Sequence, residues 1–360
     1  MNPFDFAILG AGLAGLSLAD SLNDKGHRVL VVDKGAIGSG ASGTPVGLVN
    51  PATGRKANLS WEAETCHQVI SNNLDKVQET VKHPFFSRSG VLRPAMDDKM
   101  YTHFRNAYER DNWPTGWCTW MSADEVRETN PYLVETNGGL MIHAGMSVRV
   151  PEYLTAYSAM LEKKGVTILS HQNYQLIPDG PHWQISSDQT GTLKSSSVVF
   201  AGGHAVEQTL YWRDMPVHPV KGQISRYWSS DRLSWEIPVA AFGYFAPYGE
   251  NEFVTGGTYE HDFDDEQFDE KGVDILEGKV RKTMPTLLDK STLMGQWAGV
   301  RASTPNRLPI IGPHKDQPNL HIFTGLGSKG LLYSKHVAEL LAKYLVEGKD
   351  LPEELSTGRF

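Results

Sequence analysis

Two segments, one near each end of the chain, have the hydrophobic pattern of a buried strand followed by a glycine turn and a helix. Residues 4–9 form a nearly continuous apolar run, and leucine and alanine recur at helical spacing over residues 13–23. Another apolar run, at 29–32, completes a strand–helix–strand unit. Near the carboxyl end, residues 320–324 are apolar and 331–347 predict a helix after a second glycine turn. We expect both segments to belong to one domain.

The middle of the chain alternates between helical and strand patterns. The predicted helices cover residues 60–81 with Ser60 as the capping residue, 97–111, a short capped stretch from Ser122, 151–164 and 271–284. The predicted strands cover a pair within 85–94, and 138–143, 166–169, 183–185, 197–203, 222–227, 240–246 and 252–257. Across 217–257 polar residues alternate with aromatic ones, which indicates an antiparallel sheet with one face open to a cavity. Residues 44–56 predict a loop that packs against something flat and apolar, and the acidic stretch 262–274 predicts a solvated connector.

The first glycine turn has the spacing Gly10-x-Gly12-x-x-Gly15, and the acid Asp33 ends the second strand. Gly10 allows a tight turn, Gly12 lets the backbone approach a pyrophosphate, and Gly15 lets the helix lie close to the strand. The helix start offers unpaired N–H groups to phosphates, and Asp33 can accept hydrogen bonds from ribose hydroxyls. Because strand, helix and acid all accompany the glycines, the pattern predicts dinucleotide binding.

Composition narrows the partners and the setting. The net charge of -8 and the pI near 5.9 argue against a general polyanion-binding surface, so nucleic acid is not the expected partner. No apolar run is long enough to span a membrane, and the amino terminus has no signal-peptide pattern. Only Cys66 and Cys118 are present, which favours a reduced, cytoplasmic setting, with a single bridge between them as the alternative. The histidines show no paired spacing, so we expect no metal site.

Four stretches together resemble the D-amino-acid oxidase-like flavoenzymes. They are the first glycine turn, the loop Gly38-Ser39-Gly40-Ala41-Ser42, the strand end Ala201-Gly202-Gly203, and residues 299–313, which contain Arg301 and Leu308-Pro309-Ile310-Ile311-Gly312. The resemblance covers essentially the whole chain. Within that group it is closest to glycine oxidase, to sarcosine oxidase-type enzymes, and to the oxidase domain of the bifunctional wobble-uridine tRNA-modifying enzyme.

The resemblance implies FAD as the cofactor. Sarcosine oxidases attach the flavin through a cysteine in the carboxyl-terminal turn, but the corresponding turn here, residues 325–330, has no cysteine. We therefore expect non-covalent FAD. Asp33 replaces the usual glutamate, a change that shortens the acid facing the ribose.

The implied fold class is α/β, with a Rossmann-type FAD-binding domain interleaved with an α+β substrate domain built on an antiparallel sheet. We assign residues 1–59, 138–215 and 296–360 to the FAD-binding domain, and residues 60–137 and 216–295 to the substrate domain.

Three residues receive catalytic roles from the resemblance. Arg301 aligns with the arginine that holds the substrate carboxylate in glycine oxidase-like members. Arginine suits this role because its planar guanidinium matches a carboxylate at two points. Tyr244 lies where glycine oxidase has a second carboxylate contact, and Lys329 is the candidate positive charge near the flavin. A structural salt bridge, an aromatic packed in the sheet and a surface lysine are the respective alternatives. The expected cofactor-binding residues are Gly10, Gly12, Leu13, Ala14, Gly15, Asp33, Lys34, Ser39, Ala41, Ser42, Gly47, Leu48, Tyr174, Ala201, Gly202, Arg301, Gly327, Ser328, Lys329, Gly330 and Leu331.

The implied reaction is oxidation of the C–N bond of an amino acid or secondary amine. Hydride passes from carbon to flavin N5, and the resulting imine hydrolyses. The expected substrate is a small, carboxylated amine, and the electron acceptor is oxygen or another oxidant. Two alternatives stay open: removal of a carboxymethyl group from a modified wobble uridine in tRNA, and a protein that binds FAD without catalysis. The oligomeric state stays open too.

Overall fold

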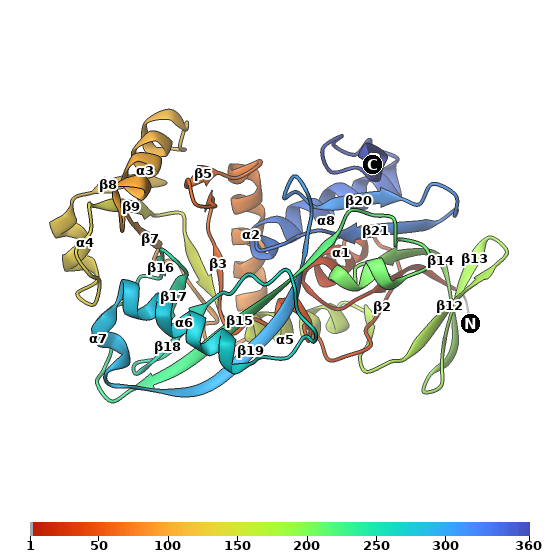
Figure 1. The fold of residues 1–360 in the computed structure, drawn as a ribbon. Coiled ribbons are helices and arrows are strands. Elements are labelled where there is room, and N and C mark those ends of the chain that lie inside the picture. The colour runs from red at the N-terminus through yellow and green to blue at the C-terminus, as the bar shows by residue number, and fades with distance from the viewer. Residues whose placement is uncertain (1–2) are drawn as a thin grey trace.

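A largely parallel sheet forms one half of the protein. The computed structural model describes residues 3–360, and within them this sheet has eight strands. Four parallel pairs join five of these strands, and a hairpin and one further strand are added antiparallel. In order across the main path they are β11 (Thr167–Leu169), β2 (Val29–Val32), β1 (Phe4–Leu9), β14 (Gly191–Phe200), β13 (His182–Ser187) and β12 (Tyr174–Asp179), while β21 (Leu320–Thr324) pairs with β14 and β20 (Ile310–Pro313) with β21. The strands at the two ends of the sequence thus lie in one sheet, as predicted (Figure 1).

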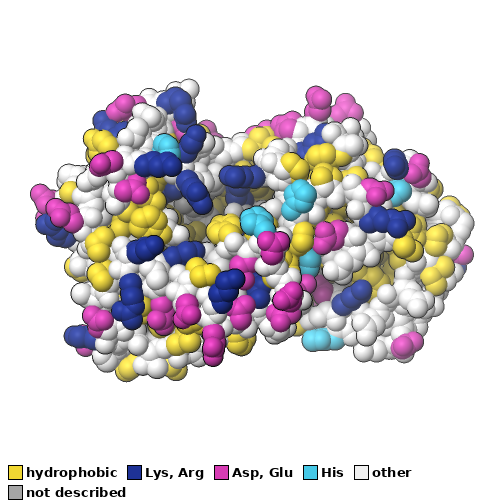
Figure 2. Space-filling model, in the orientation of Figure 1, with side chains coloured by type: hydrophobic (Ala, Val, Ile, Leu, Met, Phe, Trp, Pro, Cys, Tyr) yellow, Lys and Arg dark blue, Asp and Glu magenta, His cyan; other side chains and the backbone are white. Residues whose placement is uncertain are grey.

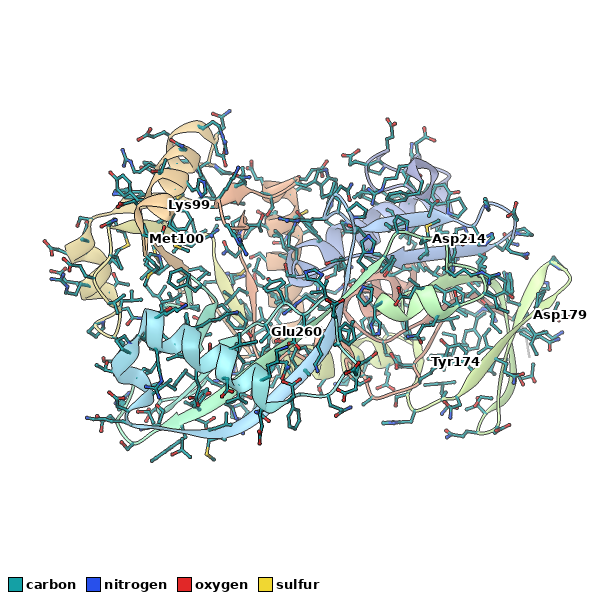
Figure 3. All side chains as sticks on the ribbon, in the orientation of Figure 1. Lys99, Met100, Tyr174, Asp179, Asp214 and Glu260 are labelled. Atoms are coloured by element: carbon teal, nitrogen blue, oxygen red, sulfur yellow. The ribbon has the colours of Figure 1, made fainter. Side chains whose placement is uncertain are left out.

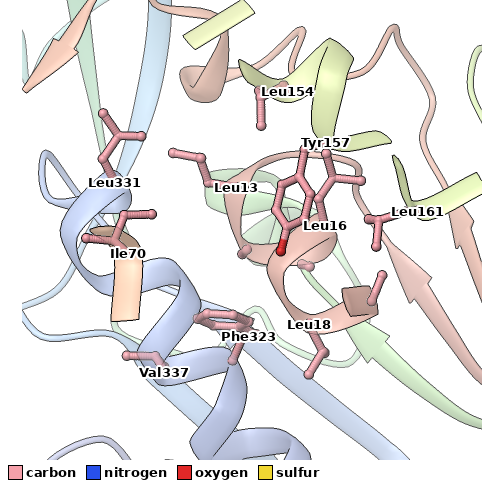
Figure 4. Packing of buried hydrophobic residues seen from close by; sticks show 14 of the residues in the cluster. Leu13, Leu16, Leu18, Ile70, Leu154, Tyr157, Leu161, Phe323, Leu331 and Val337 are labelled. Atoms are coloured by element: carbon pink, nitrogen blue, oxygen red, sulfur yellow. The ribbon is translucent and has the colours of Figure 1, made fainter. Parts of the chain in front are cut away.

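Helices pack on the parallel strands and form the largest core. They are α1 (Leu13–Asn23), α2 (Ala63–Gln78), α5 (Val150–Lys163) and α8 (Gly330–Glu347). Their leucine, valine and tyrosine side chains interdigitate around α1, as Figure 4 shows for Leu16, Ile70, Tyr157 and Val337. Burying these apolar surfaces fixes the glycine turn at the start of α1 in place.

A second sheet forms the other half, and all but one of its neighbouring strand pairs are antiparallel. Its eight strands within the described residues are, in order, β19 (Ser291–Ser303), β15 (His218–Ser229), β18 (Glu252–Gly256), β17 (Tyr244–Pro247), β16 (Val239–Ala240), β7 (Val91–Pro94), β9 (Gly139–Ile142) and β8 (Cys118–Met121). Its helices are α3 (Asp98–Arg110), α4 (Ala123–Thr129), α6 (Glu270–Thr283) and α7 (Pro285–Leu288). Further short strands form two small sheets: β3 (Gly47–Val49) and β6 (Phe86–Ser87) flank β10 (Met146–Val148), and β4 (Ala52–Thr53) pairs with β5 (Asn58–Leu59). Short 3-10 helices within the described residues are η1 (Ala41–Gly43), η2 (Gly203–Gln208) and η3 (Thr357–Arg359).

The fold class is confirmed, and several element predictions are wrong in detail. Residues 44–56 contain β3 and β4, because the apolar residues there pair as strands. Ser60 does not cap α2: its hydroxyl donates to the carbonyl of Pro51, and the helix begins at Ala63. The strands β6 and β7 do not pair with each other but with β10 and β9. The range 240–246 divides into β16 and β17, and α6 begins within the predicted acidic connector.

The division into two domains stays a proposal, and the position of α2 changes where we draw the boundary between them. Residues 60–137 were assigned to the substrate domain, yet Ile70, Leu74 and Val77 of α2 lie in the core beside α1 and α8. Strand β19 also runs across the proposed boundary at residue 296. We now propose that α2 belongs with the FAD-binding half.

A buried ionic cluster on α1 was not predicted. The side chain of Asp20 is 0% exposed, and its carboxylate accepts hydrogen bonds from Lys335 on α8 (2.7 Å) and Lys164 after α5 (2.7 Å). Lys76 on α2 (3.2 Å) and the hydroxyl of Tyr157 on α5 (3.1 Å) complete the set. Burial opposes ionisation of Asp20, but these ammonium groups outweigh it and hold the pKa of Asp20 well below its usual range. One carboxylate therefore ties α1 to three other helices.

Three further expectations, on membrane spans, metal sites and cysteines, can be compared with the structure of residues 3–360. No helix in that range is long and apolar enough to cross a membrane. The same range contains no cluster of three His, Cys, Asp or Glu side chains arranged to hold a metal ion. Cys66 and Cys118 are both free thiols, so the alternative of a bridge between them is wrong.

Candidate cofactor and substrate site

The first glycine turn is held so tightly that side chains have no room. The N–H of Gly10 donates to the carbonyl of Val32 (2.8 Å), and Gly10 has a φ of 125°, a region that favours glycine. A Cβ on Gly10 would lie 2.5 Å from the carbonyl oxygen of Ala201, and one on Gly15 would lie 1.8 Å from that of Gly10. The roles predicted for Gly10 and Gly15 in shaping the turn therefore have a steric basis.

Gly15→Ala tests this packing. The added methyl group would collide with backbone that β2 and β14 hold in place. We therefore expect the free energy of unfolding to fall by about 1–3 kcal/mol and the FAD content to fall as well. The matched control is Gly278→Ala in the middle of α6, where a Cβ meets nothing within 4 Å; it should stabilise the helix by up to about 1 kcal/mol. Thermal melting and flavin absorbance of the purified proteins measure both effects. Equal melting temperatures for the two variants would contradict the prediction.

The loop at residues 38–43 folds over the start of α1. The hydroxyl of Ser42 accepts a hydrogen bond from the N–H of Leu13 (3.1 Å), and the N–H of Gly38 donates to the carbonyl of Ala11 (3.1 Å). Asp33 accepts from the N–H of Ala11 (2.6 Å) through one carboxylate oxygen and from that of Gly35 (2.8 Å) through the other. These contacts set the acid and the hydroxyl beside the helix N-terminus, where a bound nucleotide would meet them.

The carboxyl-terminal turn meets the amino-terminal one. A Cβ on Gly330, the first residue of α8, would lie 3.0 Å from Leu13, and one on Gly47 would lie 2.5 Å from Leu331. The N–H of Gly327 donates to the carbonyl of Ala302 on β19 (2.9 Å). Two helix N-termini, β3 and β19 therefore converge. This cradle of close-packed glycines fits an elongated dinucleotide such as FAD.

Lys34 and Tyr174 extend the candidate site toward the β12–β13 hairpin. The ammonium of Lys34 lies 5.7 Å from the ring centre of Tyr174, and the two residues line a hollow of about 320 Å³ with Asn173, Gln175, Ser186 and Asp188. Burial and the nearby charge of Asp33 raise the pKa of the Tyr174 hydroxyl. Figure 3 shows Tyr174 on the hairpin side of the molecule and Glu260 near its centre.

Arg301 and Tyr244 lie near each other on one face of the second sheet. Tyr244 belongs to an apolar cluster with Val46 and Trp297, and Arg301 is four residues beyond Trp297 on β19, hence on the same face. The hydroxyl of Tyr244 donates to the carbonyl of Val46 (2.8 Å), and burial raises its pKa to about 12, so it stays protonated.

The guanidinium of Arg301 has no carboxylate partner among residues 3–360. It donates to the carbonyl of Thr258 (3.1 Å) and lies 4.7 Å from the ring centre of Tyr259, which is 64% exposed. A Cβ on Gly222, on the neighbouring strand β15, would collide with the guanidinium of Arg301. The remaining N–H donors of this cation are therefore available for an anionic ligand. Sequence reasoning missed Tyr259, because no periodicity or motif marks it.

Lys329 is turned toward α8. Its ammonium donates to the carbonyl of Arg307 (3.1 Å) and to the hydroxyl of Tyr333 (3.2 Å), and burial lowers its pKa. The surface-lysine alternative does not describe this half-buried side chain. Its role toward the flavin stays a prediction.

Between the two sheets, the surface is hollowed, and Lys and Arg side chains gather at the edge of the hollow on the second-sheet side (Figure 2). The fold and the converging glycine turns define the class of dinucleotide-binding proteins.

More specifically, the sequence matches the FAD dependent oxidoreductase family, DAO, over residues 5–344, and the chain belongs to that family. The resemblance, the enzyme class and FAD as the cofactor are thereby confirmed.

Relatives and solved structures agree with this assignment. The chain is 26% identical over 365 residues to the tRNA 5-methylaminomethyl-2-thiouridine biosynthesis bifunctional protein MnmC of Thiobacillus denitrificans, covering 98% of this chain and 58% of that protein. It is 27% identical over 375 residues to MnmC of Burkholderia vietnamiensis, covering 96% and 57%. The chain thus spans less than two thirds of these relatives. The structure of glycine oxidase from Geobacillus kaustophilus has a TM-score of 0.87 at 22% identity with full coverage of both chains, and L-proline dehydrogenase from P. horikoshii has 0.81 at 21%, covering 98% and 96%. At these identities the structures show the shared fold alone.

Proposed function

We propose that this protein oxidises the C–N bond of a small amine that carries a carboxylate, with FAD bound non-covalently. The observation that carries the proposal is the guanidinium of Arg301, which has no carboxylate partner in the described chain and belongs to the strand that contacts the carboxyl-terminal glycine turn. A guanidinium held in this way matches a substrate carboxylate.

The cofactor residues in the proposal are those of the two turns and Asp33. The N–H groups at the starts of α1 and α8 would face the pyrophosphate, and Asp33 would face the ribose. Bound FAD supplies the acceptor for a hydride from the substrate carbon.

The protein's own contribution is positioning. Arg301 would bind the carboxylate at two points, and the ring of Tyr244 would limit its rotation by contact, since the hydroxyl hydrogen is already donated to the carbonyl of Val46. The substrate amine must be neutral when its carbon loses hydride, and the apolar residues around Tyr244 favour that neutral form. Lys329 and the N-terminus of α8 would stabilise negative charge that develops nearby. The imine product hydrolyses in water.

Anaerobic reduction of the flavin tests the proposal. We expect glycine, sarcosine, proline or a D-amino acid to bleach the flavin absorbance of the purified protein, whereas amines without a carboxylate should not. Readmission of oxygen then separates an oxidase, whose colour returns at once, from a dehydrogenase that needs another acceptor. Protein that takes up FAD but is bleached by no amine would favour the non-catalytic alternative.

A second candidate is oxidation of a carboxymethylaminomethyl group on a wobble uridine of tRNA, which the similarity to MnmC favours. That group is itself an N-substituted glycine, so the same guanidinium could hold its carboxylate. The exposed Arg55 and Lys56, between β4 and β5, offer a local basic patch despite the net charge of -8. Bleaching by tRNA carrying this group, but not by tRNA lacking it, would support this candidate.

The cytoplasm is the setting we propose. The two cysteines are free and partly or fully buried, as suits a reducing compartment.

A further inference from the structure

A second cation lies beside Arg301. Lys279 extends from α6, and its ammonium donates to the carbonyl of Gly257 (2.6 Å). The guanidinium of Arg301 contacts the same residue, because a Cβ on Gly257 would lie 2.7 Å from it. The two positive charges therefore approach one glycine from different elements, α6 and β19.

No carboxylate in residues 3–360 neutralises this pair. Neither Lys279 nor Arg301 forms an ion pair in that range, whereas the buried Lys221 and Lys335 are both paired with aspartates. Glu260 follows Tyr259 in the chain, but its carboxylate is bound by the hydroxyl of Thr258 and the amide of Gln223. Two half-buried cations that repel each other cost stability, so their persistence together indicates an anionic ligand.

Their surroundings support this interpretation. Burial, followed by the charge of Arg301, lowers the pKa of Lys279, and an anion placed between the two cations would oppose this shift because it favours the charged ammonium. A single guanidinium can bind one carboxylate at two points, so a second cation at the same place is free to bind a second anionic group. Lys279 uses one donor on Gly257 and has others to spare.

We propose that Lys279 and Arg301 together select substrates with two carboxylates, one on the carbon that is oxidised and the other on a second branch of the amine. This inference rests on the proposed function and narrows its substrate class to small secondary amines with two anionic groups. Arg301 binds the carboxylate next to the reacting carbon, and Lys279 binds the outer one. The reaction is unchanged: the C–H bond breaks as a hydride that bound FAD would accept, the nitrogen lone pair forms the C=N bond, the N–H proton passes to water, and water hydrolyses the imine to an amine and an oxo acid.

Sarcosine and iminodiacetate form a matched pair of probes, because they differ only by the second carboxylate. In the FAD-loaded enzyme we expect kcat/KM for iminodiacetate to exceed that for sarcosine. Hydrogen bonds to charged groups contribute about 1.5–3 kcal/mol, so Lys279→Met should reduce this preference roughly 10- to 100-fold. Lys279→Gln keeps a donor for Gly257 without the charge and should lose the preference too.

Lys282→Met, at an exposed position on the same helix, is the control and should keep the preference. Equal kcat/KM for both probes in the wild type, or a preference that survives in Lys279→Gln, would overturn the inference. If Lys279 only supported the backbone, its variants would weaken both substrates equally.

A binding measurement separates this inference from the proposed function. Malonate should raise the melting temperature of the FAD-loaded protein at lower concentration than acetate does, and Lys279→Met should remove that difference. Should no amine bleach the flavin, the proposed function fails, yet the malonate result still decides whether the two cations form a dianion site. Identical behaviour of malonate and acetate contradicts the site.

Discussion

Arg301→Leu is expected to lower kcat/KM for carboxylated amines by roughly 30- to 4,000-fold while FAD remains bound. The range follows from the 2–5 kcal/mol that is typical when one partner of a buried, hydrogen-bonded charge pair is removed. The guanidinium contacts Thr258, Tyr259 and Gly222 but no described carboxylate, so its removal takes a binding group from the ligand and leaves no unpaired acid in the protein.

Two further variants make the measurement decisive. Arg301→Lys keeps the charge but loses the planar fork, so its kcat/KM should lie between those of the wild type and Arg301→Leu. Arg226→Leu, on the neighbouring strand β15, removes an arginine that pairs with Glu252 and should leave the kinetics unchanged. Flavin content serves as the check that the site is intact. Normal kinetics in Arg301→Leu would remove this residue from the substrate site.

The glycine turns were predictable because their pattern is local. Gly10, Gly12 and Gly15 occupy fixed positions in a strand–turn–helix unit that can be read directly from the sequence. The collisions that exclude a side chain at Gly10 and Gly12 involve Ala201 and Ser42, and only the fold shows those. The expected elements at both ends of the chain therefore match the structure nearly residue for residue. Their association was also predicted, since both patterns suit a helix N-terminus directed at the same ligand.

The substrate side was less predictable because its contacts cross between elements. Tyr259 follows a strand, Lys279 lies on a helix, and Arg301 lies on a third element, so only the fold reveals that they meet. Family resemblance indicated Arg301, but it marked neither of the other two. The pairing error at β6 and β7 has the same origin, because hydrophobic alternation predicts a strand and not its neighbour.

Asp20 shows the limit of periodicity most clearly. In the sequence it interrupts an apolar helix face, which ordinarily indicates a solvent-exposed position. In the structure it is fully buried, because lysines from three separate elements reach it. A buried acid is tolerated only when cations surround it, and single-sequence patterns do not show which cations will do so.

Asp20→Asn should destabilise the protein by about 3–5 kcal/mol, the usual cost of breaking a buried ion pair by removing one partner. Lys335 has a side chain that is only 9% exposed and would then be left without its carboxylate inside the core. Because globular proteins are stable by about 5–15 kcal/mol, this loss is large, and α1 would hold its pyrophosphate-binding end less firmly. Melting temperature and flavin retention during dialysis measure the two effects.

Asp24→Asn is the matched control. Asp24 contacts Lys76 and Lys164 as well, but its side chain is 47% exposed, and such surface pairs contribute about 0–1 kcal/mol. The double variant Asp20→Asn/Lys335→Met removes both buried charges and should recover part of the stability.

The pH dependence has a defined sign: the pKa of Asp20 is depressed by folding, so its stabilisation is present above the unfolded pKa of about 3.9 and fades as pH falls below it. The stability gap between the wild type and Asp20→Asn should therefore stay constant from neutral pH to about pH 5 and shrink below about pH 4, and a gap that widens with acid would refute the assignment of Asp20 as an ionised hub.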